Sequence, residues 1–309
     1  MTLTGPGGVG KTRLAVQVAS GLREEFAQGA AFVSLAAVRD PALVASSIAG
    51  ALGVVEGGAR MSPDRLGTAL RARELLLVLD NFEQVLDAAP LATDLLARCP
   101  QLAFLLTSRA ILRLDGEQVY RVPPLPAPDP EHLPTVEQAA TMGAVQLFVA
   151  RAQASDPAFA LTDGNLGAVA AVCHRLDGLP LAMELAAARI RVVSPDGLLA
   201  LLSDRLSVLV GGPRDAPERQ RTLRDTIAWS YNLLGEQERV ALCQIAIFAG
   251  GFDLDACAAV IGADPLVALD RLQQLVDHGL VAPVESAQPR FRMLETIRED
   301  VTRILMTSE

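Results

Sequence analysis

The sequence predicts an α/β domain with a parallel sheet over residues 1–124, a helical domain over residues 125–210 and a winged-helix domain over residues 211–309. Over the first 120 residues, short apolar runs alternate with segments of helical periodicity, which is typical of a parallel sheet covered by helices. Six prolines then fall between positions 123 and 134 and predict a stiff, extended connection. A second break, from Gly211 to Arg219, precedes a group of helical segments that contains two strand-like runs.

The composition limits the kinds of partner that the chain is expected to bind. Half of the 309 residues are hydrophobic and 20% are charged, which is enough apolar material for two or three folded domains. The formal net charge is −9. A general nucleic-acid binder, or a protein that binds anionic membranes, needs a basic face, so this charge argues against both classes.

The cysteine and hydropathy patterns favour a cytoplasmic protein that does not engage a membrane. The four cysteines (Cys99, Cys173, Cys243 and Cys257) are widely spaced and form no C-x-x-C pair, so we expect buried, reduced thiols. No apolar run reaches the roughly 18 residues that a membrane span requires. No charged-then-apolar leader is expected at the start of the chain.

Apolar periodicity predicts the elements of the first domain. Short continuous apolar runs, such as Leu75 to Leu79, predict strands that are buried on both faces. Apolar residues spaced by four, such as Leu14 and Val18, predict helices. Strands are expected at 1–4, 31–35, 75–80, 102–106 and 118–122, and helices at 13–26, 41–52, 64–73 and 84–98, with a glycine-rich turn at Gly57 and Gly58.

The stretch Gly5-Pro6-Gly7-Gly8-Val9-Gly10-Lys11-Thr12 matches the phosphate-binding pattern G-x-x-x-x-G-K-[ST]. Its glycines allow successive backbone N–H groups to converge on phosphate oxygens at the start of a helix. Lys11, the only lysine of the chain, is expected to reach the β- and γ-phosphates, and the Thr12 hydroxyl to hold Mg²⁺. The residues expected to contact a nucleotide here are Gly5, Gly7, Gly8, Val9, Gly10, Lys11, Thr12 and Arg13.

Two polar residues follow buried strands, at the edge of the sheet where ligands bind. Asp80 ends the apolar run Leu75–Leu79, and taken alone it is more often a capping residue at a strand end. The phosphate loop about 70 residues earlier favours the Walker B role, in which the carboxylate positions Mg²⁺. Arg109 follows Leu105-Leu106-Thr107-Ser108 and could sense the γ-phosphate, although a surface arginine is the alternative.

Beyond the prolines the chain is predicted to be mostly helical. Gly178-Leu179-Pro180-Leu181-Ala182 is ordinary local chemistry, in which a glycine ends one helix and a proline starts the next. Helices are expected at 136–154, 165–176, 181–193, 195–210, 222–234, 236–248, 254–261, 265–277 and 295–306, and two short strands at 280–284 and 290–294.

Four motifs occur in the order used by the NB-ARC (STAND) signal-transduction ATPases, which the chain resembles over essentially its whole length. They are the phosphate loop, Leu77-Val78-Leu79-Asp80-Asn81-Phe82-Glu83, Leu105-Leu106-Thr107-Ser108-Arg109 and Gly178-Leu179-Pro180-Leu181-Ala182. The chain is most similar to the bacterial branch found in large transcriptional regulators. This resemblance implies a P-loop NTPase domain with ADP or ATP bound between it and the following domains. It also implies that Pro180 packs on the adenine and that Arg109 is the first sensor.

The sequence departs from the family pattern at two positions. Many members carry an acidic residue directly after the Walker B aspartate, but here this residue is Asn81, which cannot act as a base at neutral pH. Glu83 is the nearest carboxylate, so the candidate catalytic residues are Lys11, Asp80, Glu83 and Arg109, with Thr12 and Asp80 as candidate magnesium ligands. Leu294 replaces the histidine that family members place near the ADP β-phosphate.

The sequence therefore predicts an ADP/ATP-binding switch module of a larger regulator, with slow ATP hydrolysis and self-association in the ATP state. Effector and sensor domains are expected to flank it. A steadily turning-over ATPase and a DNA-binding regulator that uses its winged helix are the alternatives. The helix at 265–277 carries Arg271 but also Asp270 and Asp277, which disfavours direct nucleic-acid binding by this segment.

Overall fold

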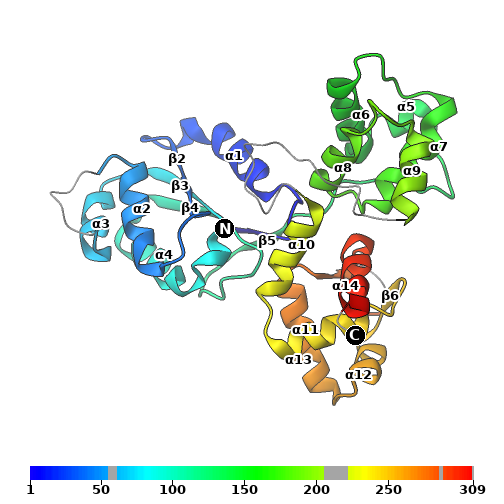
Figure 1. The fold of residues 1–309 in the computed structure, drawn as a ribbon. Helices are drawn as coiled ribbons and strands as arrows, with labels where there is room; N and C mark the ends of the chain where they lie inside the picture. Colours follow the sequence, from blue (N-terminus) through cyan, green and yellow to red (C-terminus); the bar gives the residue numbers. More distant parts are fainter. Residues whose placement is uncertain (55–60, 205–221, 285–287, 308–309) are drawn as a thin grey trace. The chain divides into compact units, whose positions relative to one another are not determined.

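The computed structural model describes residues 1–54, 61–204, 222–284 and 288–307 (Figure 1). The chain forms two compact units. The first unit consists of Met1–Gly5 and Gly10–Val122, and the second of Pro6–Val9 and Pro123–Glu309.

The first unit is built on a parallel sheet of five strands, which confirms the predicted α/β fold. The strand order is β2-β3-β4-β1-β5, so β4 lies between the strand that precedes the phosphate loop and the strand that ends in Asp80. The strands are β1 (Thr2–Thr4), β2 (Ala30–Ser34), β3 (Leu75–Asp80), β4 (Leu102–Thr107) and β5 (Val119–Arg121).

Helices cover both faces of this sheet. Helix α1 (Lys11–Gly21) contacts strands β1 to β4 on one face. On the other face, Leu75, Leu77 and Leu79 belong to a continuous core with α2 (Val44–Ala51), α3 (Pro63–Leu70) and α4 (Ala89–Arg98). The alternate residues Leu76 and Val78 are also buried, so β3 has no polar face before Asp80.

Two details of the first unit differ from the sequence prediction. The buried stripe of α1 consists of Lys11, Ala15 and Ala19 rather than Leu14 and Val18, because small side chains allow the helix to lie close to the sheet. The helix expected to start at residue 84 starts at Ala89, after two short 3-10 turns (Phe82–Gln84 and Leu86–Ala88). Pro90 accounts for this, since inside a helix it would clash with the preceding turn, whereas it fits at the start.

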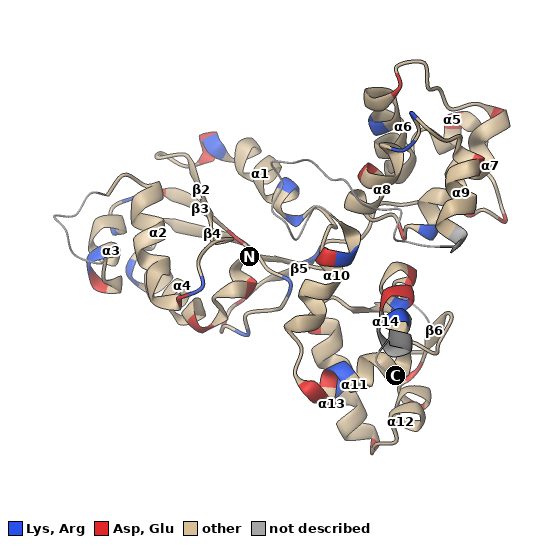
Figure 2. Ribbon diagram, viewed as in Figure 1, with Lys and Arg blue, Asp and Glu red and all other residues tan. Residues whose placement is uncertain are grey.

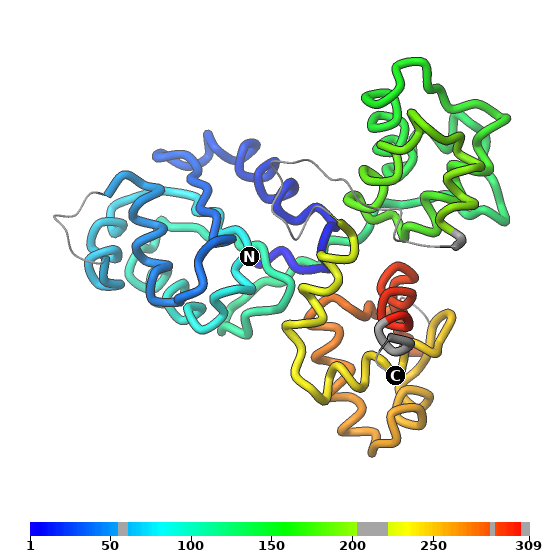
Figure 3. Tube along the Cα trace, in the orientation of Figure 1, coloured from blue at the N-terminus to red at the C-terminus, as the bar shows by residue number. Residues whose placement is uncertain are grey.

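In the second unit, residues 123–204 form helices, drawn in green in Figure 3. The predicted helix 136–154 is divided into α5 (Val136–Ala139), which a Thr135 capping box starts, and α6 (Gly143–Ser155). They are followed by α7 (Asp163–Arg175), α8 (Pro180–Ala187) and α9 (Pro195–Asp204). The remainder of the predicted helix 195–210, the break from Gly211 to Arg219 and the Gly57-Gly58 turn lie outside the described residues.

Residues 222–307 form helices around a small antiparallel sheet with the order β6-β8-β7. The predicted strands are present, and a third, two-residue strand joins them because Phe252 packs on Phe248 and Phe291. The elements are α10 (Leu223–Asn232), α11 (Glu236–Ile245), β6 (Gly251–Phe252), α12 (Leu254–Ile261), α13 (Pro265–Asp277), β7 (Val281–Val284), β8 (Arg290–Met293) and α14 (Glu295–Thr307).

The four cysteines are free thiols in the structure. Burial raises the pKa of Cys173 to about 12, which keeps this thiol protonated at neutral pH. Within the described residues, no helix combines the length and apolarity needed to cross a bilayer.

Gly178 gives a direct test of the connection between α7 and α8. Its φ is +64°, and a Cβ at this position would lie 2.0 Å from the Leu125 carbonyl oxygen. We expect Gly178→Ala to lower the free energy of unfolding by about 2 kcal/mol or more, because both the backbone strain and the clash must be relieved. Urea denaturation measures this. In the control Gly164→Ala, the new Cβ would meet Thr162 Oγ1 at an ordinary 3.7 Å, so equal losses for the two variants would contradict the prediction.

Candidate functional site

Three glycines of the phosphate loop have positive φ angles, which residues with a side chain adopt only with backbone strain. Gly5, Gly8 and Gly10 have φ angles of +141°, +80° and +96°. Gly10 is the residue that precedes the first turn of α1, so the loop leads directly into the N-terminus of that helix. A Cβ at Gly8 would lie 2.8 Å from Leu181 Cβ. The loop therefore requires glycine for its conformation, and at Gly8 also for packing.

Lys11 is folded back onto its own loop. Its side chain is only 8% exposed, and Nζ donates a hydrogen bond to the Gly5 carbonyl oxygen at 2.8 Å. An ammonium group held against a loop carbonyl oxygen at a helix N-terminus is positioned for an anion in the same loop. The structure thus places the Lys11 ammonium group inside the loop, at the N-terminus of α1.

Asp80 lies at the carboxyl end of β3 and is 4% exposed. Its Oδ1 accepts hydrogen bonds from Thr12 Oγ1 at 2.7 Å and from Thr107 Oγ1 at 2.6 Å. It forms no ion pair with any of the described residues. A carboxylate this buried is costly when only neutral hydroxyls compensate its charge. The donor set, a carboxylate beside a threonine hydroxyl of the phosphate loop, fits a hard divalent cation such as Mg²⁺.

Thr107 is a residue of this site that the sequence interpretation missed. Its hydroxyl donates to Asp80 and accepts the backbone N–H of Asn81 at 3.0 Å, so it orients both residues at the end of β3. It is 1% exposed. The sequence interpretation singled out Arg109, two residues later, instead. The signal that could have identified Thr107 is its position as a polar residue at the end of a buried apolar strand.

Glu83 and Arg109 form a second buried group. Arg109 Nε lies 3.4 Å from Glu83 Oε1, and the two side chains are 5% and 1% exposed. Asn81 Nδ2 lies 3.5 Å from the same oxygen, with the Asn81 backbone in the left-handed region at φ +64°. Glu83 Oε2 has no hydrogen-bond partner among the described residues. The structure thus brings together Asn81, Glu83 and Arg109. Both contacts are made by Glu83 Oε1.

The other residues predicted to contact the nucleotide differ in their burial and in the elements that carry them. Val9 is buried, whereas Arg13 is exposed on α1. Pro180 is the first residue of α8, and its neighbour Leu181 donates its backbone N–H to the Gly8 carbonyl oxygen at 3.1 Å. The start of α8 and the tip of the phosphate loop are therefore in direct contact.

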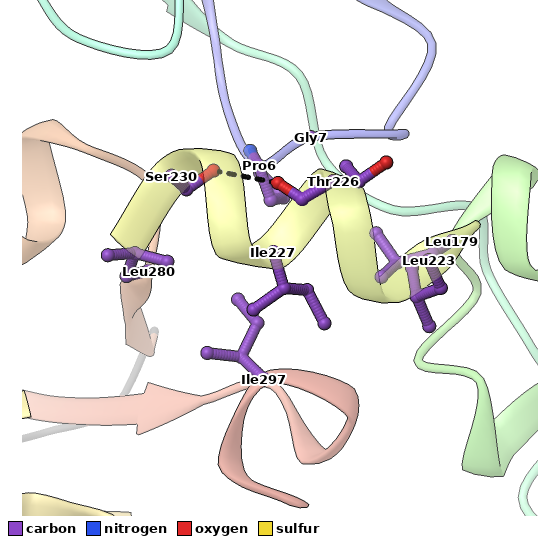
Figure 4. Close-up of a pocket in the computed structure, with 9 residues that line it drawn as sticks. All are labelled: Pro6, Gly7, Leu179, Leu223, Thr226, Ile227, Ser230, Leu280 and Ile297. Carbon is purple, nitrogen blue, oxygen red and sulfur yellow. Dashed lines mark hydrogen bonds between the residues drawn. The ribbon is translucent and has the colours of Figure 1, made fainter. Parts of the chain in front are cut away.

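A mostly apolar pocket in the second unit lies beside this contact (Figure 4). In Figure 4, α10 presents Thr226 and Ser230 on the side of Pro6, and the Ser230 hydroxyl donates to the Thr226 carbonyl. The pocket is lined by Pro6, Gly7, Leu179, Leu223, Thr226, Ile227, Ser230, Leu280 and Ile297.

Thr107→Val tests the bond network at Asp80. Valine has the shape of threonine but lacks the hydroxyl, so Asp80 loses a donor and the Asn81 N–H loses its acceptor. We expect the free energy of unfolding to fall by about 1–3 kcal/mol, the cost of leaving buried polar groups unpaired. Thr107→Ser keeps the hydroxyl and should cost less in the same urea titration. A larger loss for serine than for valine would show that methyl packing, not the hydroxyl, matters at this position.

Comparison with known proteins gives the relatives of this chain. A family model described as a winged helix-turn-helix domain matches residues 234–305. The chain is 42% identical over 303 residues to the "Putative HTH-type transcriptional regulator Rv0890c" of Mycobacterium tuberculosis, an alignment that covers 96% of this chain and 33% of the relative. It is 31% identical to the regulatory protein AfsR of Streptomyces griseus, covering 96% of this chain and 29% of AfsR. The chain thus spans about a third of the length of these relatives.

Among solved structures, the chain resembles the Aeropyrum pernix ORC2 protein, whose structure is of ADPNP–ADP complexes. The TM-score is 0.52 at 17% identity, and the match covers 99% of this chain and 88% of the other. This likeness, with the family model, supports the predicted fold: an α/β domain with a parallel sheet, a helical region and a winged helix.

A shorter relative aligns over most of its own length. The uncharacterized protein Rv0894 of Mycobacterium tuberculosis is 39% identical over 306 residues, which cover 97% of this chain and 74% of the relative. At that identity and coverage the two chains share one fold and one ancestry. The chain therefore belongs to the family of the uncharacterized protein Rv0894.

Proposed function

We propose that this chain is the ADP/ATP-binding switch module of a larger transcriptional regulator, of the NB-ARC (STAND) kind. The observation that carries the proposal is the hydrogen bond from Thr12 to Asp80, which joins the end of the phosphate loop to a buried carboxylate on another strand. A glycine-rich turn formed by chance would not need that second element. The regulator names of the longer relatives support the setting.

The described side chains support separate roles in this proposal. Lys11 and the loop N–H groups would hold the phosphates, while Thr12 and Asp80 would hold Mg²⁺, which supplies charge neutralisation at the phosphates when bound. Pro180, whose neighbour is bonded to the loop, would contact the adenine. Flanking sensor and effector domains and self-association in the ATP state complete the proposed switch.

Replacement of Lys11 tests phosphate binding. Lys11→Ala should weaken ATP binding by about 2 kcal/mol or more, because a charge-assisted contact is lost. Isothermal titration calorimetry measures the affinity. Lys11→Arg keeps the charge but replaces a compact amine by a planar fork, and it should recover only part of the loss. An unchanged affinity in Lys11→Ala would remove the phosphate loop from the site.

The second buried group supports slow rather than rapid hydrolysis. Glu83 faces Arg109, so the nearest carboxylate is engaged with the proposed γ-phosphate sensor. Asn81 occupies the position next to Asp80 and is not a base at neutral pH. A triphosphate state that persists suits a switch, because it must outlast the assembly it permits.

Single-turnover kinetics separate the switch from a steadily turning-over ATPase. General-base assistance is worth about 10²–10⁴-fold, so the unaltered chain should hydrolyse ATP more slowly than about 1 s⁻¹. Asn81→Asp should raise the rate without tightening binding, since aspartate also tolerates the left-handed backbone. Glu83→Gln is the comparison: if it abolishes the rate while Asn81→Asp changes nothing, Glu83 is the base. Rapid turnover by the unaltered chain would favour the ATPase alternative.

DNA binding by the winged helix is a second candidate, favoured by the winged helix-turn-helix match and by the names of the relatives. The exposed side of α13 does not favour it. Leu266 is 72% exposed, and Asp270 and Gln273 are exposed beside it. Figure 2 shows acidic and basic positions interspersed over the described helices of this segment. We infer that any DNA contact of the whole regulator is made mainly by regions other than α13.

A DNA titration at several salt concentrations tests this inference. With a net charge of −9 and an apolar and acidic α13 surface, the chain should show no salt-sensitive affinity for duplex DNA. Fluorescence anisotropy with a labelled duplex measures the binding, and bovine serum albumin, also acidic, is the negative control. A steep fall in affinity between about 50 and 200 mM salt would show that this segment contacts phosphates directly.

A further inference from the structure

The connection between α7 and α8 holds the start of α14 through Thr296, which lies 119 residues after Asp177 in the sequence. Asp177 Oδ2 accepts two hydrogen bonds from Thr296, one from its backbone N–H and one from its hydroxyl, both at 2.9 Å. Two residues earlier, Arg175 Nη2 donates to Glu299 Oε1 at 2.8 Å. We call these two contacts the α14 clasp.

The clasp supplies a side-chain hydrogen-bond acceptor at the start of α14, where the local sequence has none at the N-cap. Leu294 immediately precedes the helix, and its carbonyl oxygen accepts the N–H groups of Ile297 and Arg298, so it occupies the N-cap position. A leucine side chain cannot accept a hydrogen bond from the free N–H groups of the first turn. Asp177 provides that acceptor from another segment, and its negative charge lies at the positive end of the helix. Thr296 is fully buried in this contact.

Asp177 lies in a turn with a left-handed backbone. Asp177 has a φ of +53° and is followed by Gly178 at +64°, so two successive residues are left-handed. Such a conformation in a residue with a side chain is costly and persists where surrounding contacts impose it. The Asp177 and Gly178 N–H groups donate to the carbonyls of His174 and Cys173, which fixes the turn at the end of α7.

The other end of the same segment touches the phosphate loop. Leu181 donates its backbone N–H to Gly8, and a Cβ at Gly8 would collide with the Leu181 side chain. Leu179, between the two ends, lines the pocket together with Pro6 and with Ile297 of α14. Residues 175–181 therefore contact the phosphate loop at one end and α14 at the other.

We propose that residues 175–181 couple the phosphate loop to α14, with Asp177 as the residue that fixes the helix. The proposal rests on the nucleotide binding proposed above and adds its regulation. While the clasp is closed, Leu181 is held against Gly8 and the loop keeps the nucleotide. When the clasp opens, the start of α8 is free to move away from the loop, and the nucleotide leaves faster. By linkage, a bound nucleotide in turn protects the start of α14.

Nucleotide release and hydrogen exchange test this coupling in the whole chain. Asp177→Asn removes the charge but suits the left-handed backbone, since asparagine tolerates it well. Thr296→Val removes one of the two hydrogen bonds with almost no change of shape. We expect Asp177→Asn to speed release of the fluorescent nucleotide N-methylanthraniloyl-ADP by about fivefold or more, the lower end of common coupling effects, and Thr296→Val to have a smaller effect in the same direction. Asp163→Asn, an exposed aspartate on α7, should leave release unchanged.

Amide exchange of the α14 peptide, followed by mass spectrometry without nucleotide, reports the clasp itself. It should rise in Asp177→Asn and Thr296→Val and stay unchanged in Asp163→Asn. Faster α14 exchange with unchanged nucleotide release would overturn the coupling. If Asp177→Asn does not fold, Thr296→Val decides between these results. If the unaltered chain fails to bind the nucleotide, the proposed function fails and the coupling with it, although the exchange measurement still shows whether the clasp exists.

Discussion

The buried carboxylate of Asp80 is the constraint on which the first unit depends. It lies at the end of a strand with no polar face, and the hydroxyls of Thr12 and Thr107 are the donors that compensate it. These donors come from the first turn of α1 and from the end of β4, so the strand order β3-β4-β1 must be correct before Asp80 is satisfied. The hydrogen bonds of Asp80 therefore depend on the strand order of the sheet.

The phosphate loop contains residues of both compact units. Its base is attached to β1 and α1, whereas its tip, Pro6–Val9, belongs by its contacts to the second unit. Gly8 permits this because only a residue without a Cβ can lie against Leu181.

The sequence could bring some residues of the candidate site together because they lie at strand ends and in a fixed loop pattern. Lys11, Thr12 and Asp80 could be placed together, since parallel strands end at one edge of the sheet. The pairing of Glu83 with Arg109 could not, because each follows a different strand and nothing local indicates which oxygen faces which nitrogen. Thr107 escaped notice for a related reason: a threonine in an apolar strand is also a common structural residue.

The sequence by itself determined the type and order of most helices and strands, since periodicity reports which residues are buried and glycine and proline mark where elements end. It also contains the complete G-x-x-x-x-G-K-[ST] pattern at Gly5–Thr12. Only the tertiary structure decided that α1 packs through Ala15 and Ala19, that Pro90 delays α4, and that Asp177 caps α14. Periodicity shows that a side chain is buried but not what buries it. A bond between residues 119 positions apart is set by the folded arrangement of both segments, which no local pattern encodes.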